Sequence, residues 1–169
     1  MIAHAFFKRL APGLVCLALV GAPALSQERL RGVVELFTSQ ACSSCPPADR
    51  LMNEMSGDKS LVTLSYPVDY WDYTGWKDTL AIPGCAARQK AYAAARGDAH
   101  VYTPQAIVDG IGHVAGADRG AIEKAVAGNA PHSLAGEVRV GLREDNGRLN
   151  VSVEGPEKVE AARVLLVSV

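Results

Sequence analysis

The sequence lacks the features that mark several large classes of protein. It contains no cluster or stripe of lysine and arginine, and its 17 basic and 18 acidic residues give a net charge of −1. Such a surface has nothing that could follow a phosphate backbone, so we expect no nucleic-acid partner. After the first 26 residues there is also no uncharged apolar run of the roughly 18 residues that a transmembrane helix needs. We therefore expect no stable membrane insertion of the mature chain.

Cysteine is scarce too, with four in the chain. A structural zinc site uses four Cys or His ligands, and the pair Cys42 and Cys45 without a second pair is weak evidence for one. Cu(I) suits soft thiolates, and His100, His113 or His132 could approach the pair in space. Because such histidines are more often surface or satisfied residues, we expect no metal site and no bound cofactor.

The first 26 residues have the pattern of a secretory leader. Lys8 and Arg9 form a basic start, residues 10–20 are mostly apolar, and residues 22–26 offer small side chains for cleavage. We expect a periplasmic or secreted protein, in a compartment where disulfides persist. Cleavage would remove two of the 17 basic residues and none of the 18 acidic ones, which leaves 15 basic residues and a net charge of −3.

Residues 27–132 have the length and pattern of one α/β domain. The predicted elements are a strand at 32–38, a helix from the cysteine pair through 51–55, a strand at 61–66, a helix at 86–96, strands at 105–109 and near 113–114, and a helix at 118–127. The first strand–helix–strand unit predicts a right-handed parallel crossover. Gly97 is expected to stop one helix and Asp118 to cap another.

Residues 133–169 change to an alternating apolar pattern, interrupted by Asp145-Asn146-Gly147. This combination predicts a β-hairpin extension. A third apolar run at 164–169 would be an aggregation hazard as an exposed edge. We therefore expect that it is covered, or that the extension is truncated here and the natural chain continues.

The two cysteines at 42 and 45 follow an apolar strand and stand where a helix begins. Such a pair can close a small disulfide, and a helix start supplies free N–H donors and a partial positive charge that favour a thiolate. Ser43 and Ser44, at this helix N-terminus, can donate hydrogen bonds but carry no charge. A helix end contributes about 0.3–1 kcal/mol, below the about 1.36 kcal/mol of one pKa unit, so we expect a modestly lowered pKa for Cys42.

Pro46 and Pro47 help to locate the helix start, because proline is tolerated in the first turn. If Cys42 were the N-cap, residue 46 would have to donate the first helical hydrogen bond, which proline cannot do. The first turn is therefore expected to be distorted or to start nearer Ser44. A permanent disulfide that only staples this turn is the alternative to redox exchange.

Residues 69–78 form an aromatic loop that carries both tryptophans of the chain. Trp71, Tyr73 and Trp76 could bind an apolar or peptide ligand beside the cysteine pair. They could equally form a satellite core that holds a long insertion, because aromatic rings serve either purpose.

The segments 34–49, 68–78 and 101–110 resemble the secreted thioredoxin-like family known as domain of unknown function 1223. The resemblance implies an α/β fold with a thioredoxin-like core, in which helices flank a central mixed sheet, and a β-rich C-terminal extension. Three positions depart from the family pattern. Ala41 stands where glycine is usual, Pro67 stands where a histidine is usual, and Cys85 is additional. We expect Cys85 to be a buried, small apolar residue.

The resemblance also implies roles for individual residues. Cys42, with the exposed sulfur, would attack a partner, and Cys45 would resolve the mixed disulfide. The Thr103–Pro104 bond would be cis and face the disulfide, with Thr103 offering backbone groups to an extended substrate. Without the resemblance a trans proline would be favoured, because only about one X-Pro bond in twenty is cis.

These observations favour an exported thioredoxin-like thiol-disulfide oxidoreductase that needs a protein thiol or disulfide as its redox partner. One alternative is a non-enzymatic ligand- or protein-binding module with a structural disulfide. Another is a copper-handling protein that uses the same thiols.

Overall fold

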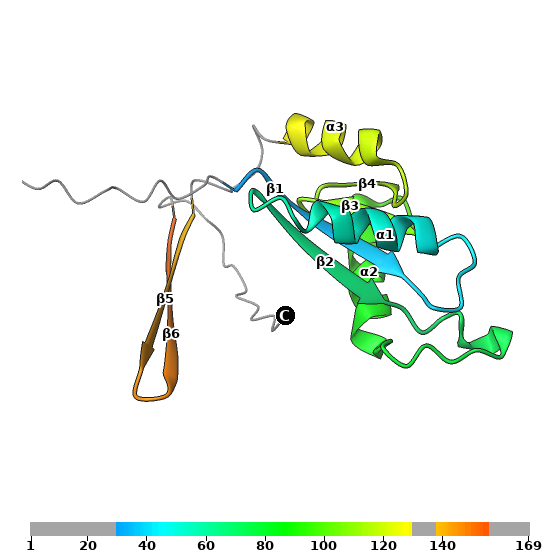
Figure 1. Ribbon diagram of the computed structural model, residues 1–169, viewed down its shortest axis with the longest axis horizontal. Helices are drawn as coiled ribbons and strands as arrows, with labels where there is room; N and C mark the ends of the chain where they lie inside the picture. The colour runs from blue at the N-terminus through cyan, green and yellow to red at the C-terminus, as the bar shows by residue number, and fades with distance from the viewer. Residues whose placement is uncertain (1–29, 130–137, 156–169) are drawn as a thin grey trace, which may run out of the picture.

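The computed structural model describes residues 30–129 and 138–155. Their backbone forms a four-stranded mixed sheet flanked by helices and a separate two-stranded antiparallel sheet (Figure 1). The chain order is β1 (Gly32–Thr38), α1 (Pro46–Met55), β2 (Leu61–Pro67), a 3₁₀ turn η1 (Asp72–Thr74), α2 (Pro83–Arg96), β3 (Gln105–Val108), β4 (Gly112–Ala115), α3 (Arg119–Asn129), β5 (Arg139–Asp145) and β6 (Arg148–Glu154). The expected α/β fold with a β-rich C-terminal extension is confirmed.

Strand β1 is an inner strand of the larger sheet, whose order is β2-β1-β3-β4. It runs parallel to β2 and antiparallel to β3, and β3 runs antiparallel to β4. An inner strand is covered on both faces, which is why six of its seven residues are buried. The predicted parallel crossover from β1 through α1 to β2 is confirmed.

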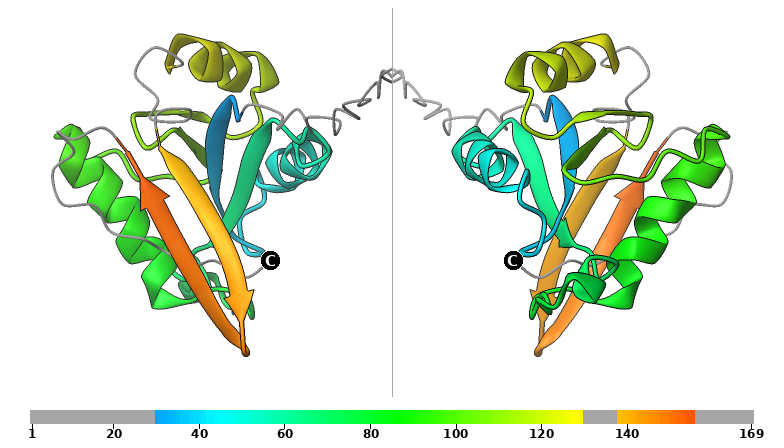
Figure 2. Two further views of the ribbon diagram at one scale, coloured as in Figure 1. Left: turned by 90° about the vertical axis from the view of Figure 1, so that its left-hand side faces the viewer. Right: turned by 90° about the vertical axis from the view of Figure 1, so that its right-hand side faces the viewer.

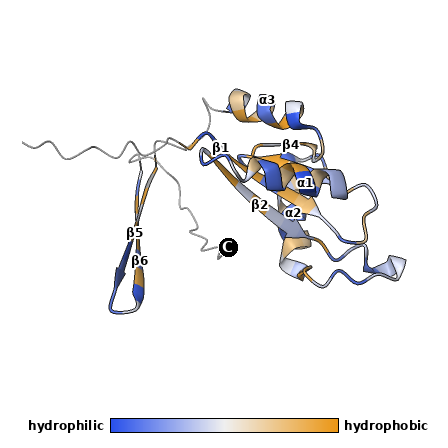
Figure 3. Cartoon of the chain, viewed as in Figure 1, coloured by the Kyte–Doolittle hydropathy of each residue, from blue (hydrophilic) through white to orange (hydrophobic). Residues whose placement is uncertain are grey.

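The two faces of the sheet carry separate apolar clusters. Figure 2 shows the helices that flank the sheet. Val34 and Leu36 point toward α1 and α3, whereas the next residue, Phe37, packs with Cys85 and Ala86 of α2 on the other face. This division follows from the period of two along a strand. Figure 3 shows that the flanking helices carry both hydrophobic and hydrophilic residues.

Helix α1 begins later than the sequence pattern suggested. Its N-cap is Cys45, so Pro46 and Pro47 occupy the first two helical positions, where a missing N–H has no cost. The first helical bonds run from the N–H groups of Ala48 and Asp49 to the Cys45 carbonyl, at 2.9 and 3.0 Å. Of the two alternatives expected for the first turn, the helix start nearer Ser44 is the one observed. Cys42 lies one turn before the helix.

The predicted hairpin is confirmed as β5 and β6, with Asn146 and Gly147 at φ values of 50° and 74° in its turn. Apolar side chains remain exposed along both strands, with Leu142 at 64% and Val151 at 41%. The predicted leader and the apolar run at 164–169 lie outside the described residues. Among the helices that are described, none has the length and apolar character to cross a bilayer.

Candidate functional site

Cys42 and Cys45 form a disulfide in the turn between β1 and α1, with their Cα atoms 5.4 Å apart. Backbone hydrogen bonds shape this turn. The Cys42 N–H donates to the Ser39 carbonyl and the Cys45 N–H donates to the Cys42 carbonyl, each at 3.1 Å. The Ser44 hydroxyl lies 3.4 Å from the Cys42 Sγ, so one of the two predicted serines contacts the sulfur pair.

The sulfur pair is buried, which corrects the expectation of an exposed Cys42 sulfur. Cys42 is 2% exposed and Cys45 is fully buried, whereas Ser43 and Ser44 between them are exposed. The turn therefore leaves its two serines exposed and its two cysteines buried. The Cys45 side chain is buried against the body of the protein, and the disulfide holds Cys42 there with it.

Three segments meet at the same end of the sheet. Strands β1 and β2 are parallel and end opposite each other, since Thr38 pairs with Pro67, so the cysteine turn and the aromatic loop leave the sheet together (Figure 1). Strand β3 enters from this end, because Gln105 pairs with Phe37 in the antiparallel register. Residues 103 and 104 therefore reach the sheet at the end where Cys42 leaves it.

The Thr103–Pro104 peptide bond is cis, as the family resemblance implied. The Pro104 carbonyl accepts a hydrogen bond from the Gly116 N–H at 3.0 Å. A Cβ atom built on Gly116 would lie 2.6 Å from Leu36 Cδ1 and 3.0 Å from Pro104 Cβ. Glycine at 116 thus allows Pro104 to lie close to the inner strand that leads to the cysteines.

The aromatic loop is partly core and partly surface, and ligand binding by its exposed rings stays a prediction. Trp71 packs against the apolar cluster on the α2 face, and its Nε1–H donates to Thr103 Oγ1 at 2.7 Å. Tyr73 stacks on Trp71 but is 82% exposed, and Trp76 is 63% exposed. The structure therefore joins Trp71 to Thr103 and leaves two aromatic rings toward solvent.

A buried carboxylate, which the sequence analysis did not single out, connects the aromatic loop to the cysteine turn. Asp78 is 2% exposed and accepts hydrogen bonds from the N–H of Gln40 at 2.8 Å and of Leu80 at 2.9 Å. Gln40 also lies within reach of Trp76, whose Nε1 is 3.5 Å from Gln40 Oε1. No local pattern distinguishes Asp78 from the half-buried Asp69 and Asp72 of the same loop.

Two buried glutamines hold the segment before Pro104. Gln89 Nε2 donates to the Tyr102 carbonyl at 2.8 Å and to Gln105 Oε1 at 2.7 Å, and Gln105 Nε2 donates to the His100 carbonyl at 3.1 Å. The helical period could have identified Gln89 as a buried residue, because it lies four residues after Cys85 and four before Ala93 on the buried face of α2.

A charged cluster lies under the same face of the sheet. Glu35 of β1 receives hydrogen bonds from Arg88 at 2.6 and 2.7 Å and from the Tyr92 hydroxyl at 2.8 Å. Burial, followed by the neighbouring Glu35 carboxylate, raises the pKa of Tyr92 well above its usual value. Cys85 of α2 is a free, buried thiol whose pKa is raised by burial, which confirms the expected apolar role.

Comparison with known proteins places the chain in a family. Residues 33–169 match the family model described as "Protein of unknown function (DUF1223)". The chain belongs to the DUF1223 family. A crystal structure of a protein from Agrobacterium tumefaciens resembles this DUF1223 chain with a TM-score of 0.70 and 42% sequence identity. The match covers 76% of this chain and 58% of the other, so the DUF1223 chain matches less than two thirds of that protein. The search of curated proteins found no match to this chain.

Proposed function

We propose that this chain is an exported, thioredoxin-like thiol-disulfide oxidoreductase. The observation that carries the proposal is the closed Cys42–Cys45 disulfide at the sheet end where the aromatic loop and the cis Thr103–Pro104 bond also lie. A chemically reversible sulfur pair beside exposed aromatic rings and an extended backbone segment suits a protein partner. The compartment is proposed to be the periplasm or the exterior, where such a pair can be oxidised.

The exchange conserves atoms and electrons. In the reduced protein the Cys42 thiolate attacks one sulfur of a partner disulfide, forms a mixed disulfide and releases the other partner sulfur as a thiolate. The Cys45 thiolate then attacks the Cys42 sulfur, closes the Cys42–Cys45 bond and releases the second partner thiolate. The cysteine pair loses two electrons and two protons, and the partner gains both. The same steps in reverse oxidise a partner dithiol.

The closed turn at 42–45 controls access to the sulfur pair. Because Cys42 is 2% exposed, a partner thiolate reaches its sulfur only after the turn at 42–45 moves. The exposed rings of Tyr73 and Trp76 provide an apolar docking surface on the loop that Asp78 ties to this turn. Docking there and opening of the turn are proposed to occur together.

The same burial favours a second candidate, a non-enzymatic binding module with a structural disulfide. In this case the sulfur pair only staples the turn, and the exposed aromatic rings hold a ligand or a protein. The reduction potential separates the two candidates. A structural disulfide has a potential below about −300 mV, and an exchange pair lies between about −120 and −270 mV.

Trapping of partners tests the enzyme directly. In Cys45→Ser, Cys42 is expected to remain joined to partners as mixed disulfides, which are recovered from the exported fraction and released by reductant. Cys42→Ser is the matched control, because it keeps a single thiol at the other position. Both variants carry Cys85→Ala so that the third thiol forms no adducts. The enzyme proposal is wrong if Cys45→Ser traps no more protein than Cys42→Ser and the reduction potential lies below about −300 mV. The non-enzymatic binding module with a structural disulfide is then the correct candidate.

A further inference from the structure

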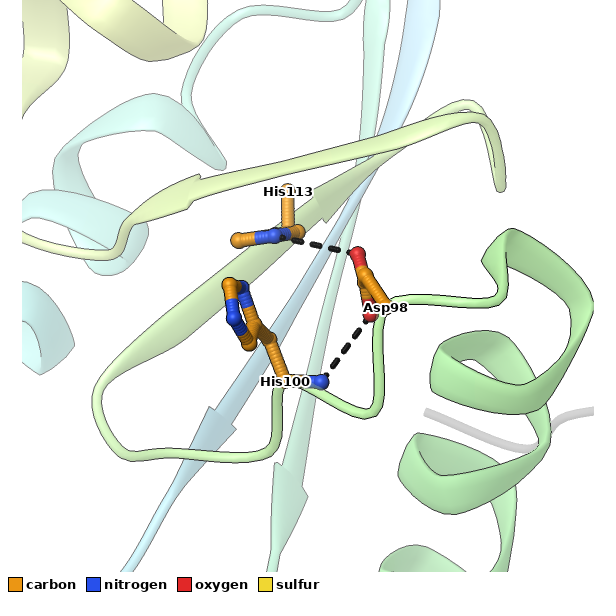
Figure 4. Close-up of side chains that lie close together, drawn as sticks. All are labelled: Asp98, His100 and His113. Atoms are coloured by element: carbon orange, nitrogen blue, oxygen red, sulfur yellow. Dashed lines mark hydrogen bonds and ion pairs between the residues drawn. The ribbon is translucent and has the colours of Figure 1, made fainter.

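Two histidines and a carboxylate converge beyond the C-terminal end of α2, in a group that the proposed redox function does not use. Asp98 and His100 lie in the segment after α2, and His113 lies on the edge strand β4 (Figure 4). One ligand atom from each of the three side chains can be chosen so that all lie within 4.8 Å of one another. His113 Nε2 and Asp98 Oδ2 are 3.4 Å apart.

One of these distances, between His113 and Asp98, matches the ligand spacing of a metal centre. Ligands bound tetrahedrally at about 2.0–2.1 Å are separated from one another by about 3.3 Å, since the edge of a tetrahedron is about 1.6 times its centre-to-corner distance. The His113–Asp98 separation of 3.4 Å already has this value. The ligand atom of His100 lies within 4.8 Å of the other two. Because the His100 side chain is exposed, its ring can turn toward them.

His113 has the second partner that a metal-binding histidine needs. Its Nδ1 is 2.9 Å from the Tyr102 hydroxyl, which leaves Nε2 on the side of Asp98. A metal-ligating imidazole commonly hydrogen-bonds through its other ring nitrogen, which fixes the tautomer and the ring orientation. Tyr102 would be this positioning residue, because it touches His113 and would not touch the ion.

The backbone holds Asp98 and His100 on the same side. Asp98 Oδ1 accepts a hydrogen bond from the His100 N–H at 3.0 Å, and Ala99 between them has a φ of 54°. A non-glycine residue in this region is uncommon, and it reverses the chain so that residues 98 and 100 approach. The buried Gln105 side chain fixes the other end of the turn through the His100 carbonyl.

One cation already contacts the carboxylate. Arg96 Nε lies 2.7 Å from Asp98 Oδ2, and Arg96 Nη2 lies 3.2 Å from Oδ1. A carboxylate has about four lone-pair directions, so Arg96 does not exhaust its capacity. The positive charge lowers the affinity for any metal ion, and it disfavours hard cations such as Ca²⁺ that depend on carboxylate charge. Two imidazoles instead favour a borderline transition metal ion.

We propose that Asp98, His100 and His113 bind one divalent transition metal ion, with Zn²⁺ as the representative ion. The three protein ligands leave a fourth position for water or an external ligand, as in open zinc sites. This proposal departs from the expectation of no metal site, which the titration below tests. Copper bound by the cysteine thiols is a different site, since a closed disulfide offers no thiolate.

The test is a Zn²⁺ titration of the full protein with its disulfide closed, in competition with a chromophoric chelator. The wild type is expected to bind one Zn²⁺. His113→Ala, His100→Ala and Asp98→Asn are each expected to lose at least about a hundredfold in affinity, since even second-shell changes cost about 10–100-fold. Tyr102→Phe, which removes only the hydroxyl, is expected to lose about tenfold.

Asp58→Asn is a matched control. Asp58 accepts from the Ser60 N–H two residues on, at 2.9 Å, and pairs with Arg31 at 2.6 Å, so it repeats the local contacts of Asp98 without histidines. Its Zn²⁺ affinity is expected to equal that of the wild type. Equal loss in Asp58→Asn and Asp98→Asn, or wild-type affinity in both histidine variants, would overturn the site.

A spectroscopic measurement keeps the proposal testable if a variant does not fold. In ¹⁵N NMR spectra of the wild-type protein, the imidazole signals of His100 and His113 are both expected to shift on addition of one equivalent of Zn²⁺. If the imidazole signals of both residues stay unchanged, the proposed site is wrong, whatever the behaviour of the variants. Oxidoreductase activity is not part of either readout, so this proposal and the proposed redox function fail independently.

Discussion

Three nearly inaccessible polar side chains, Glu35, Asp78 and Gln89, connect the helices and loops around the site. Each makes at least one hydrogen bond to a segment distant in sequence. Glu35 binds α2, Asp78 binds the backbone before the cysteine turn, and Gln89 binds the segment before Pro104. Because a buried polar group without a partner costs about 1–3 kcal/mol, these contacts specify where each segment lies.

Arg88→Met is expected to lower the free energy of unfolding by about 3 kcal/mol. The substitution leaves the Glu35 carboxylate, whose side chain is 5% exposed, without its cation. The value is at the low end for buried pairs because the Arg88 side chain is 29% exposed. Urea denaturation measures the change.

Two further variants control for the loss of a salt bridge as such. Arg119→Met breaks an exposed pair with Glu54, whose side chains are 46% and 64% exposed, and should cost less than about 1 kcal/mol. Glu35→Gln combined with Arg88→Met removes both charges and should recover part of the loss. Equal losses in Arg88→Met and Arg119→Met would contradict the role given to burial.

At the scale of elements, the end of α2 decides how the chain enters the 98–104 segment. Gly97 has a φ of 74°, and its N–H donates to the Ala93 and Ala94 carbonyls. A left-handed residue at this position satisfies the last free carbonyls and reverses the chain. Asp98, His100 and Thr103 follow directly, so the helix end sets the path of three candidate site residues.

Gly97→Ala is expected to destabilise the protein by about 1–2 kcal/mol, because an L-residue is disfavoured in the left-handed region. The space around Gly97 is open, so no clash contributes. Gly128→Ala in α3, also in open space, is the matched control and should stabilise by about 0.5–1 kcal/mol. Thermal unfolding of both variants checks the signs, and stabilisation by Gly97→Ala would refute the capping role.

At the scale of the whole molecule, the strand order brings the segments of the candidate site to one end of the sheet. The order β2-β1-β3-β4 places the ends of β1 and β2 beside the start of β3. Segments that are far apart in the chain therefore leave or enter the sheet at one end. The apolar clusters on the two faces of this sheet, rather than the small disulfide ring, hold the fold together.

Reduction of the Cys42–Cys45 disulfide is therefore expected to leave the protein folded. The bond closes a ring with a sequence separation of 3, for which loop entropy predicts a loss of about 2 kcal/mol. Far-UV circular dichroism of the reduced protein should match that of the oxidised protein, with a lower urea midpoint. Unfolding upon reduction would contradict this expectation and favour the structural disulfide.

Much of the fold follows from local pattern. The run at 32–38 is a strand with the predicted bounds, Gly97 and Asp118 end and cap helices, and Asn146-Gly147 turns the hairpin. The proline pair also marks the helix start, although the N-cap is Cys45 rather than an earlier residue. These features depend on backbone preferences of a few neighbouring residues, which a single sequence contains in full.

The sequence by itself determined the strands, the helix ends and the cysteine pair, because each depends on residues within one or two turns of chain. Only the tertiary structure decided that the sulfurs are buried, that Trp71 binds Thr103, and that His113 joins Asp98 and His100. Such contacts depend on register between strands and on which helix face meets the sheet. They form between residues far apart in the chain, where local periodicity carries no information about distance.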